Sequence, residues 1–159
     1  MLVSLNNFCY NTAMNAYEFM KKAGELTSKN QQHYIDFAKA HGVNYNTLAV
    51  LYTCYVNKAC TQKQVTIEWY VPKQTVNTIC KELIAEGLLS KVRGDKDHRE
   101  TIIRLTEKGI QKAAPIVEQL LRIESNIVES MGEDGSREFL EIYSAYSELL
   151  ETEFSKDVD

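Results

Sequence analysis

The chain has 159 residues and a formal net charge of −4 at pH 7. This length suits one domain-sized core, or a small domain with added dimerisation helices, and the acidic balance argues against a uniformly basic nucleic-acid binder. The sequence has no signal-peptide pattern and no apolar run near the roughly 18 residues that a membrane-spanning helix needs, so we expect a cytoplasmic protein.

Helical spacing of apolar residues dominates the first third of the chain. Apolar or small side chains recur with helical period from about residue 5 to 23, the segment 24–28 weakens the pattern, and a second helical piece is expected from about 29 to 40. Asn44 or Asn46 can cap the next helix, which ends near Val56. The most apolar stretch, Thr47 to Val56, predicts that this helix is buried.

Residues 61–109 are typical of one DNA-binding unit: a short helix, a tight turn, a second helix and a charged β-hairpin. Apolar residues at positions 76, 79, 80 and 83 form the stripe of an amphipathic helix, with Pro72 suited to its first turn and Gly87 to its C-terminal stop. The opposite face carries side chains that can contact phosphates and base edges in a major groove: Lys73, Gln74, Thr75, Asn77, Thr78 and Lys81.

A β-hairpin is predicted directly after that helix. Residues 88–93 and 100–105 are rich in β-branched and aliphatic side chains, and the polar segment 94–98 joins them as a turn. Such a tip can reach a DNA backbone or a narrow minor groove, where arginine is favoured. We therefore expect a wing that contacts DNA through Lys91, Arg93, Lys96 and Arg99.

The C-terminal third predicts two further helices. After Thr106, which can cap, a helix is expected from about 107 to 130, bent at Pro115; residues 131–135 break it, and a last helix runs from about 135 to 154. Long amphipathic helices at both ends bury their apolar faces best against a second copy. The predicted fold is thus mainly α with a small β wing: a winged helix-turn-helix DNA-binding domain at 41–109, with helical dimerisation regions at 1–40 and 110–159. An intramolecular helical bundle is the alternative.

Positive charge is concentrated on the segment expected to meet phosphates. Residues 58–112 hold eleven Lys or Arg and seven Asp or Glu, a net of +4, which leaves −8 on the rest of the chain. Residues 113–159 alone carry twelve acids and three bases. This distribution favours salt-dependent DNA binding by the central segment, with the acidic segment facing away.

Four segments in this order resemble the MarR family of bacterial winged helix-turn-helix regulators. They are Thr61-Gln62 through Lys73-Gln74-Thr75-Val76; Leu83 with Glu86-Gly87-Leu88-Leu89; Asp97-His98-Arg99; and Leu105-Thr106-Glu107-Lys108-Gly109. The resemblance implies a homodimer that binds a pseudo-palindromic operator, usually as a repressor, and releases it when a small molecule or an oxidant is sensed. Family members often carry Gly where this chain has Tyr70 and Arg where it has Thr78.

The sequence leaves the sensed signal open. The resemblance implies a small aromatic or amphipathic ligand in a crevice between the winged helix and the dimerisation helices. Candidates to line it are Met14, Tyr17, Tyr45, Tyr52 and Trp69, although aromatics at helical spacing are more often core.

Oxidant sensing is the alternative, because Cys9 sits roughly where the peroxide-sensing branch of the family keeps its reactive cysteine, with Tyr10 and Tyr17 as candidate hydrogen-bonding partners. A small buried hydrophobe is the other interpretation of Cys9. Cys54 and Cys80 fall on apolar helix faces and are expected in the core.

Other classes of function find little support. The four cysteines, with Cys60 among them, show no C-x-x-C spacing, and His33, His41 and His98 include no chelating pair, so we expect no metal or other cofactor. The known nucleotide-binding and hydrolase motifs are absent from the sequence, which argues against an enzyme. A helical interaction module that contacts protein instead of DNA would not need four basic side chains on one hairpin.

Overall fold

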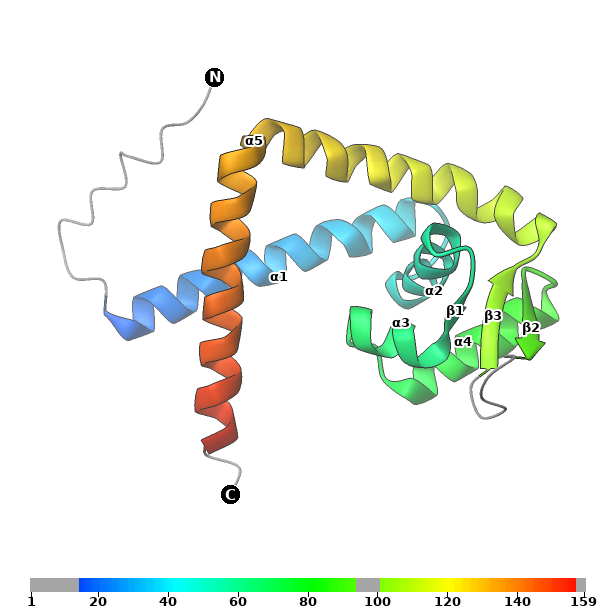
Figure 1. Ribbon diagram of the computed structural model, residues 1–159, viewed down its shortest axis with the longest axis horizontal. Helices are drawn as coiled ribbons and strands as arrows, with labels where there is room; N and C mark the ends of the chain where they lie inside the picture. The colour runs from blue at the N-terminus through cyan, green and yellow to red at the C-terminus, as the bar shows by residue number, and fades with distance from the viewer. Residues whose placement is uncertain (1–14, 94–100, 157–159) are drawn as a thin grey trace.

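The computed structural model describes residues 15–93 and 101–156. A compact body of short helices and a small sheet lies at one end, and two long helices extend from it (Figure 1). The elements are α1 (Ala16–Ala40), α2 (Tyr45–Val56), β1 (Cys60–Thr61), α3 (Gln62–Trp69), α4 (Lys73–Ala85), β2 (Leu89–Arg93), β3 (Thr101–Leu105) and α5 (Glu107–Lys156). The predicted fold class, mainly α with a small β wing, is confirmed.

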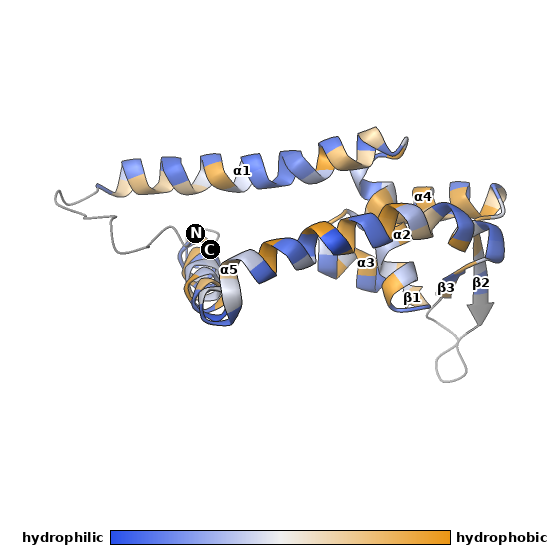
Figure 2. Ribbon diagram, turned by 90° about the horizontal axis from the view of Figure 1, so that it is seen from above, coloured by the Kyte–Doolittle hydropathy of each residue, from blue (hydrophilic) through white to orange (hydrophobic). Residues whose placement is uncertain are grey.

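Helix α1 is continuous, in contrast to the weakened segment expected at 24–28. It begins after Asn15, whose side-chain oxygen accepts a hydrogen bond from the Glu18 N–H at 2.9 Å. Gly24 lies inside it without interrupting it, because one glycine costs only about 1 kcal/mol relative to alanine in a helix interior. Its apolar residues lie towards its two ends, and residues 27–33 in its middle are all polar (Figure 2).

Helix α2 forms the centre of the core, as its sequence predicts. Asn44 is its cap and accepts from the Thr47 N–H at 2.8 Å, so the first of the two candidate caps is the one used. Six of its twelve residues are buried. Around it pack α3, α4, the sheet and the beginning of α5, through side chains that include Val65, Val76, Leu83, Ile103 and Val117.

Helices α3 and α4 form the helix-turn-helix. Helix α3 is capped by Thr61 and ends at Tyr70, which has left-handed backbone angles (φ 52°, ψ 33°). Pro72 is the N-cap of α4, so this helix begins one residue later than expected, at Lys73. Gly87 (φ 73°) ends it through hydrogen bonds from Gly87 N to Ile84 O and from Leu88 N to Leu83 O, the pattern of a Schellman motif.

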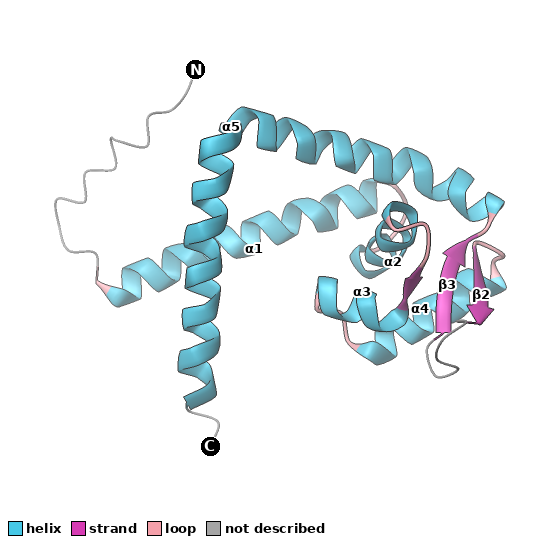
Figure 3. Ribbon diagram, in the orientation of Figure 1, coloured by secondary structure: helices cyan, strands magenta, loops and turns pink. Residues whose placement is uncertain are grey.

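The sheet has three antiparallel strands in the order β1-β3-β2 (Figure 3). Strands β2 and β3 pair from Leu89 with Leu105 to Arg93 with Thr101, which confirms the predicted hairpin. The two-residue strand β1 was not expected from the sequence; it pairs Cys60 with Ile103. This pairing joins the hairpin to the start of the helix-turn-helix.

Helix α5 changes direction once, at Gly132. The Thr106 side chain caps it by accepting from Gly109 N at 3.0 Å. The backbone leaves the helical conformation at Gly132 (φ 73°, ψ 169°) and not at Pro115, so the break predicted at 131–135 is confirmed and the sharp bend is not at the proline. Beyond Gly132 the helix crosses α1 (Figure 1), where the rings of Phe19 and Tyr146 are 6.0 Å apart.

Candidate nucleic-acid interface

Helix α4 separates an apolar face from a hydrogen-bonding face, as the sequence predicts. Val76, Ile79, Cys80 and Leu83 are buried. Lys73, Gln74, Thr78 and Lys81 belong to the other face, together with the half-buried Thr75 and Asn77. The Thr78 hydroxyl donates to the Gln74 carbonyl of its own helix at 3.0 Å, so in this geometry it offers an outside partner only an acceptor.

The hairpin strands are held against the core by Leu88, Leu89, Ile103 and Leu105, which are buried. Lys91 is exposed on β2. Arg93 is the last residue of β2, while Lys96 and Arg99 lie outside the described residues, so their expected DNA contacts stay predictions. Arg104 on β3 is also exposed, and it was not predicted as a site residue because both of its strand neighbours are apolar.

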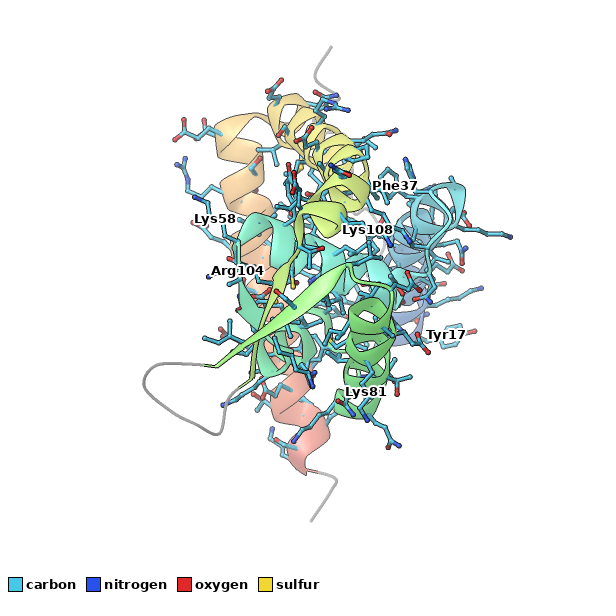
Figure 4. All side chains as sticks on the ribbon, turned by 90° about the vertical axis from the view of Figure 1, so that its right-hand side faces the viewer. Tyr17, Phe37, Lys58, Lys81, Arg104 and Lys108 are labelled. Carbon is cyan, nitrogen blue, oxygen red and sulfur yellow. The ribbon has the colours of Figure 1, made fainter. Side chains whose placement is uncertain are left out.

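A dense set of contacts joins the end of α4 to the beginning of α5. Gly109 is buried against the backbone of Leu88, where an added Cβ would lie 2.0 Å from the Leu88 carbonyl oxygen. The Lys108 ammonium donates to the Glu86 carbonyl at 2.8 Å, and Lys112 forms an ion pair with the Glu86 carboxylate at 3.8 Å. Lys108 lies at the top of the winged helix in Figure 4. These contacts fix α5 to the proposed DNA-contacting helix.

Three of the five aromatic or apolar candidates for a ligand site meet in one cluster. The Trp69 ring lies 5.6 Å from Tyr45 and 5.5 Å from Tyr52, both edge to face. Its indole N–H donates to the Thr53 hydroxyl at 3.0 Å. Tyr17 is 74% exposed. It lies about 26 Å along α1 from Tyr34, which shares the hydrogen-bond acceptor Glu124 with Tyr52, so Tyr17 cannot join the cluster within one chain. Met14 lies outside the described residues.

A carboxylate that was not predicted as a site residue lies beside this cluster. Glu124 on α5 accepts hydrogen bonds from Tyr34 on α1 at 3.2 Å and from Tyr52 on α2 at 3.1 Å. Burial, followed by the nearby negative charge of Glu124, raises the pKa of Tyr52 to about 12 and also raises that of Tyr34. The partners are 90 and 72 residues apart in sequence, so no local pattern could have indicated them.

The described cysteines are buried free thiols, as expected for Cys54 and Cys80. The sulfur atoms of Cys54 and Cys60 are 3.0 Å apart. The contact with Cys60 and then burial raise the pKa of Cys54, and burial raises that of Cys80 to about 11, so neither forms a reactive thiolate readily. Cys9, the candidate oxidant sensor, lies outside the described residues together with Tyr10.

Of the two described histidines, one contacts neighbouring polar groups and the other is exposed. His41 follows α1 and lies within hydrogen-bonding distance of the Phe37 carbonyl (2.8 Å) and of Gln119 on α5 (3.1 Å); His33 is exposed on α1, and His98 falls outside the described part. Within residues 15–93 and 101–156, no group of three or more His, Cys, Asp or Glu could hold a metal ion. In the same part of the chain, no helix is both long and apolar enough to cross a membrane.

Comparisons with known proteins agree with this geometry. A family model described as transcriptional regulator SarA/Rot matches residues 32–116. A MarR family regulator from Neisseria meningitidis is 28% identical, with a TM-score of 0.79 over 87% of this chain and 97% of that one.

Two more distant structures share the fold. The transcription regulator MarR from Oenococcus oeni is 16% identical, with a TM-score of 0.65 over 81% of this chain and 98% of its own. The PcaV transcriptional regulator from Streptomyces coelicolor, in complex with its natural ligand, is 20% identical, with a TM-score of 0.58 over 79% and 91%. No curated protein sequence matches the chain. The winged-helix fold and the MarR resemblance inferred from the sequence are confirmed.

Proposed function

The chain belongs to the SarA/Rot family of transcriptional regulators, and we propose that it acts in the cytoplasm as a homodimeric repressor that binds a pseudo-palindromic operator and is released by a small-molecule ligand. The observation that carries this proposal is the polar face of α4. The opposite face of the same helix is buried, and a basic hairpin follows the helix. Two such helices related by a two-fold axis would meet half-sites about 34–36 Å apart.

We assign different tasks to the residues of the α4 face. Gln74, Thr75, Asn77 and Thr78 are proposed to read base edges, while Lys73 and Lys81 hold phosphates. Asn77→Ala is therefore expected to cost about 1–3 kcal/mol on the operator and less on random DNA. Lys81→Ala should weaken both complexes and lower the salt dependence of binding. Equal operator-to-random ratios for the two variants would contradict this division.

The hairpin residues Lys91, Arg93, Lys96 and Arg99 are proposed to contact the DNA backbone or minor groove. Arg99→Ala should weaken operator binding at moderate salt and leave the melting temperature unchanged, because the sequence predicts Arg99 at the end of a polar hairpin tip, where a side chain supports little core. Lys39→Ala, which removes an exposed lysine from α1, is the matched control. Native affinity in Arg99→Ala would remove the wing tip from the mechanism.

The helical arms, residues 1–40 and 110–159, are proposed to form the dimer. Near the crossing of α1 and α5 they expose large apolar side chains, which in a single chain would face water: Phe19, Met20, Phe139, Leu140, Ile142, Tyr143 and Leu149. Exposed apolar surface of this extent is typical of an interaction site. We assign dimerisation to 1–40 and 110–159 and DNA binding to 41–109.

A test of this dimer needs an apolar residue that is exposed in the single chain. Leu120 and Leu121 do not qualify, because they pack against the chain's own core and a charge there would damage the monomer. Ile142 is 64% exposed, and Ile142→Asp should produce monomers in sedimentation and reduce operator affinity towards the non-specific level. Val56→Asp, an exposed apolar position outside the arms, should stay dimeric. An Ile142→Asp dimer with native affinity would overturn the proposed interface.

The effector is proposed to bind near the cluster of Tyr45, Tyr52 and Trp69, where the winged helix meets α1 and α5. Met14 and Tyr17 would belong to this site only if the second copy of the proposed dimer contributed them. Trp69 is the single tryptophan of the chain, so its fluorescence reports this region directly. A ligand that releases operator should change Trp69 fluorescence with the same midpoint. Release without any such change would place the effector elsewhere.

A further inference from the structure

A groove of about 440 Å³ lies on the proposed DNA-binding domain, and none of the three aromatic cluster residues lines it. It is formed by the end of α2 and the turn after it, by strand β3 and by the first turn of α5. Figure 4 shows two of its residues, Lys58 and Arg104, on the same side of the domain. The lining residues are Cys54, Tyr55, Lys58, Arg104, Leu105 and Ile110.

The groove has an apolar floor and wall. Cys54 and Leu105 are buried side chains of the main core, and Ile110, on the first turn of α5, is 48% exposed. The volume falls within the range typical of small-molecule sites, which combine apolar walls with a few polar groups. This part of the groove can therefore take up the apolar body of a small molecule.

The polar groups of the groove carry positive charge. Among the described residues, neither Lys58 nor Arg104 has an acidic partner within salt-bridge distance. The Glu118 carboxylate of α5 accepts a hydrogen bond from the Tyr55 hydroxyl at 2.6 Å, so one negative charge also lies beside the groove. The lining side chains themselves carry two positive charges and no negative one.

Lys58 has a backbone conformation that its residue type does not favour. Its φ is 62°, in the left-handed region where asparagine or glycine is more common. Non-glycine residues in this region are strained, and they cluster at functional sites. Here the unfavourable conformation places a lysine at the edge of an apolar groove.

We propose that this groove binds a small organic anion, whose apolar body packs against Leu105 and Ile110 and whose carboxylate lies between Lys58 and Arg104. A guanidinium can hold a carboxylate through two parallel hydrogen bonds, and the lysine adds a second charge. Binding itself does not depend on the proposed operator binding. Its consequence does: a ligand that joins β3 to α2 and α5 would fix the position of the wing relative to the helices.

Calorimetric titration of the full chain without DNA tests the site, with benzoate and hexanoate as aryl and alkyl probes. At least one of the two should bind, and its neutral amide should bind at least about tenfold more weakly, because it lacks the charge that the two cations hold. Arg104→Gln and Lys58→Asn should each weaken binding about tenfold or more. The second variant keeps a residue type that tolerates the left-handed backbone, so its fold should persist. Lys39→Gln removes the same charge outside the groove and should bind normally.

Three results would overturn the proposal: no binding of either probe, equal binding of acid and amide, or unchanged binding in both groove variants whose melting temperatures match the native protein. Binding that survives in these variants but alters Trp69 fluorescence would place the anion at the aromatic cluster and also overturn it. Because no DNA is present, none of these outcomes bears on the proposed operator binding. Loss of operator binding in a protein that still binds the probe would contradict only the proposed function.

Discussion

Gly109 provides the sharpest test of how α5 is joined to the winged helix. A Cβ at this position would lie 2.0 Å from the Leu88 carbonyl oxygen, 2.9 Å from the Leu88 carbonyl carbon and 3.1 Å from a methyl group of Leu105. Since ordinary contacts of a Cβ begin near 3.4 Å, Gly109→Ala forces α5 and the backbone after α4 apart. The obstacle is backbone, which cannot rotate away.

Two destabilising effects and one stabilising effect determine how much Gly109→Ala changes the free energy of unfolding. Overpacking of a well-packed site costs about 1–3 kcal/mol. The same Leu88 oxygen accepts from Thr106 N at 3.0 Å, and loss of that hydrogen bond adds about 1 kcal/mol. Alanine returns up to about 1 kcal/mol through its helix propensity. We expect Gly109→Ala to lower the free energy of unfolding by about 2 kcal/mol.

Gly24→Ala is the matched control, because it makes the same substitution inside α1, where a Cβ would meet no atom within 4 Å. Only the propensity gain applies, so this variant should be more stable by about 0.5–1 kcal/mol. Urea unfolding of both variants at the same protein concentration measures these changes and keeps the contribution of any self-association comparable. Equal changes of the same sign in the two variants would refute the close approach of α5 to Leu88.

Three further substitutions test other parts of the structure. Tyr70 is 94% exposed in a left-handed turn, so Tyr70→Gly should leave the free energy of unfolding unchanged or raise it by up to about 1 kcal/mol; a clear loss would mean that the ring has a contact within the fold. Because the pKa of Tyr52 is raised from 10.0 to about 12, its protonated form stabilises the fold fully below pH 10 and progressively less up to pH 12. Tyr52→Phe should therefore lose less stability across that window, and parallel pH profiles would contradict the raised pKa of Tyr52, whose first cause is burial. Gly132 has angles that are essentially restricted to glycine, so Gly132→Ala should straighten α5 and alter the scattering profile and the sedimentation of the proposed dimer, while unchanged profiles would show that the break does not depend on this glycine.

The parts of the fold that the sequence predicts are those determined within a few residues. The cap by Asn44, the stop at Gly87 and the apolar stripe of α4 depend on neighbours three or four positions away, and each could be inferred from spacing. The hairpin is also local, because only seven residues separate the end of β2 from the start of β3.

The features that the sequence did not predict depend on distant partners. Strand β1 has two residues and exists because Cys60 and Thr61 pair with Ile103 and Ile102. Glu124 obtains its role from tyrosines on two other helices, and the groove beside Arg104 is formed by segments that only the fold brings together. Gly24 illustrates the opposite case: a local signal for a break that the rest of a 25-residue helix overrides.

Helix α5 connects these parts mechanically. Its first turns contact the backbone at the end of α4 through Gly109 and Lys108, its middle holds α1 and α2 through Glu124, and after Gly132 it turns across α1 towards the proposed dimer contact. A ligand that separates Tyr52 from Glu124 would therefore release α5 between two fixed points and change the angle at which α4 is presented. Since a two-fold operator requires both α4 helices at one spacing, we propose that a rotation of α5 about its Gly109 contact would mismatch the proposed dimer and its half-sites.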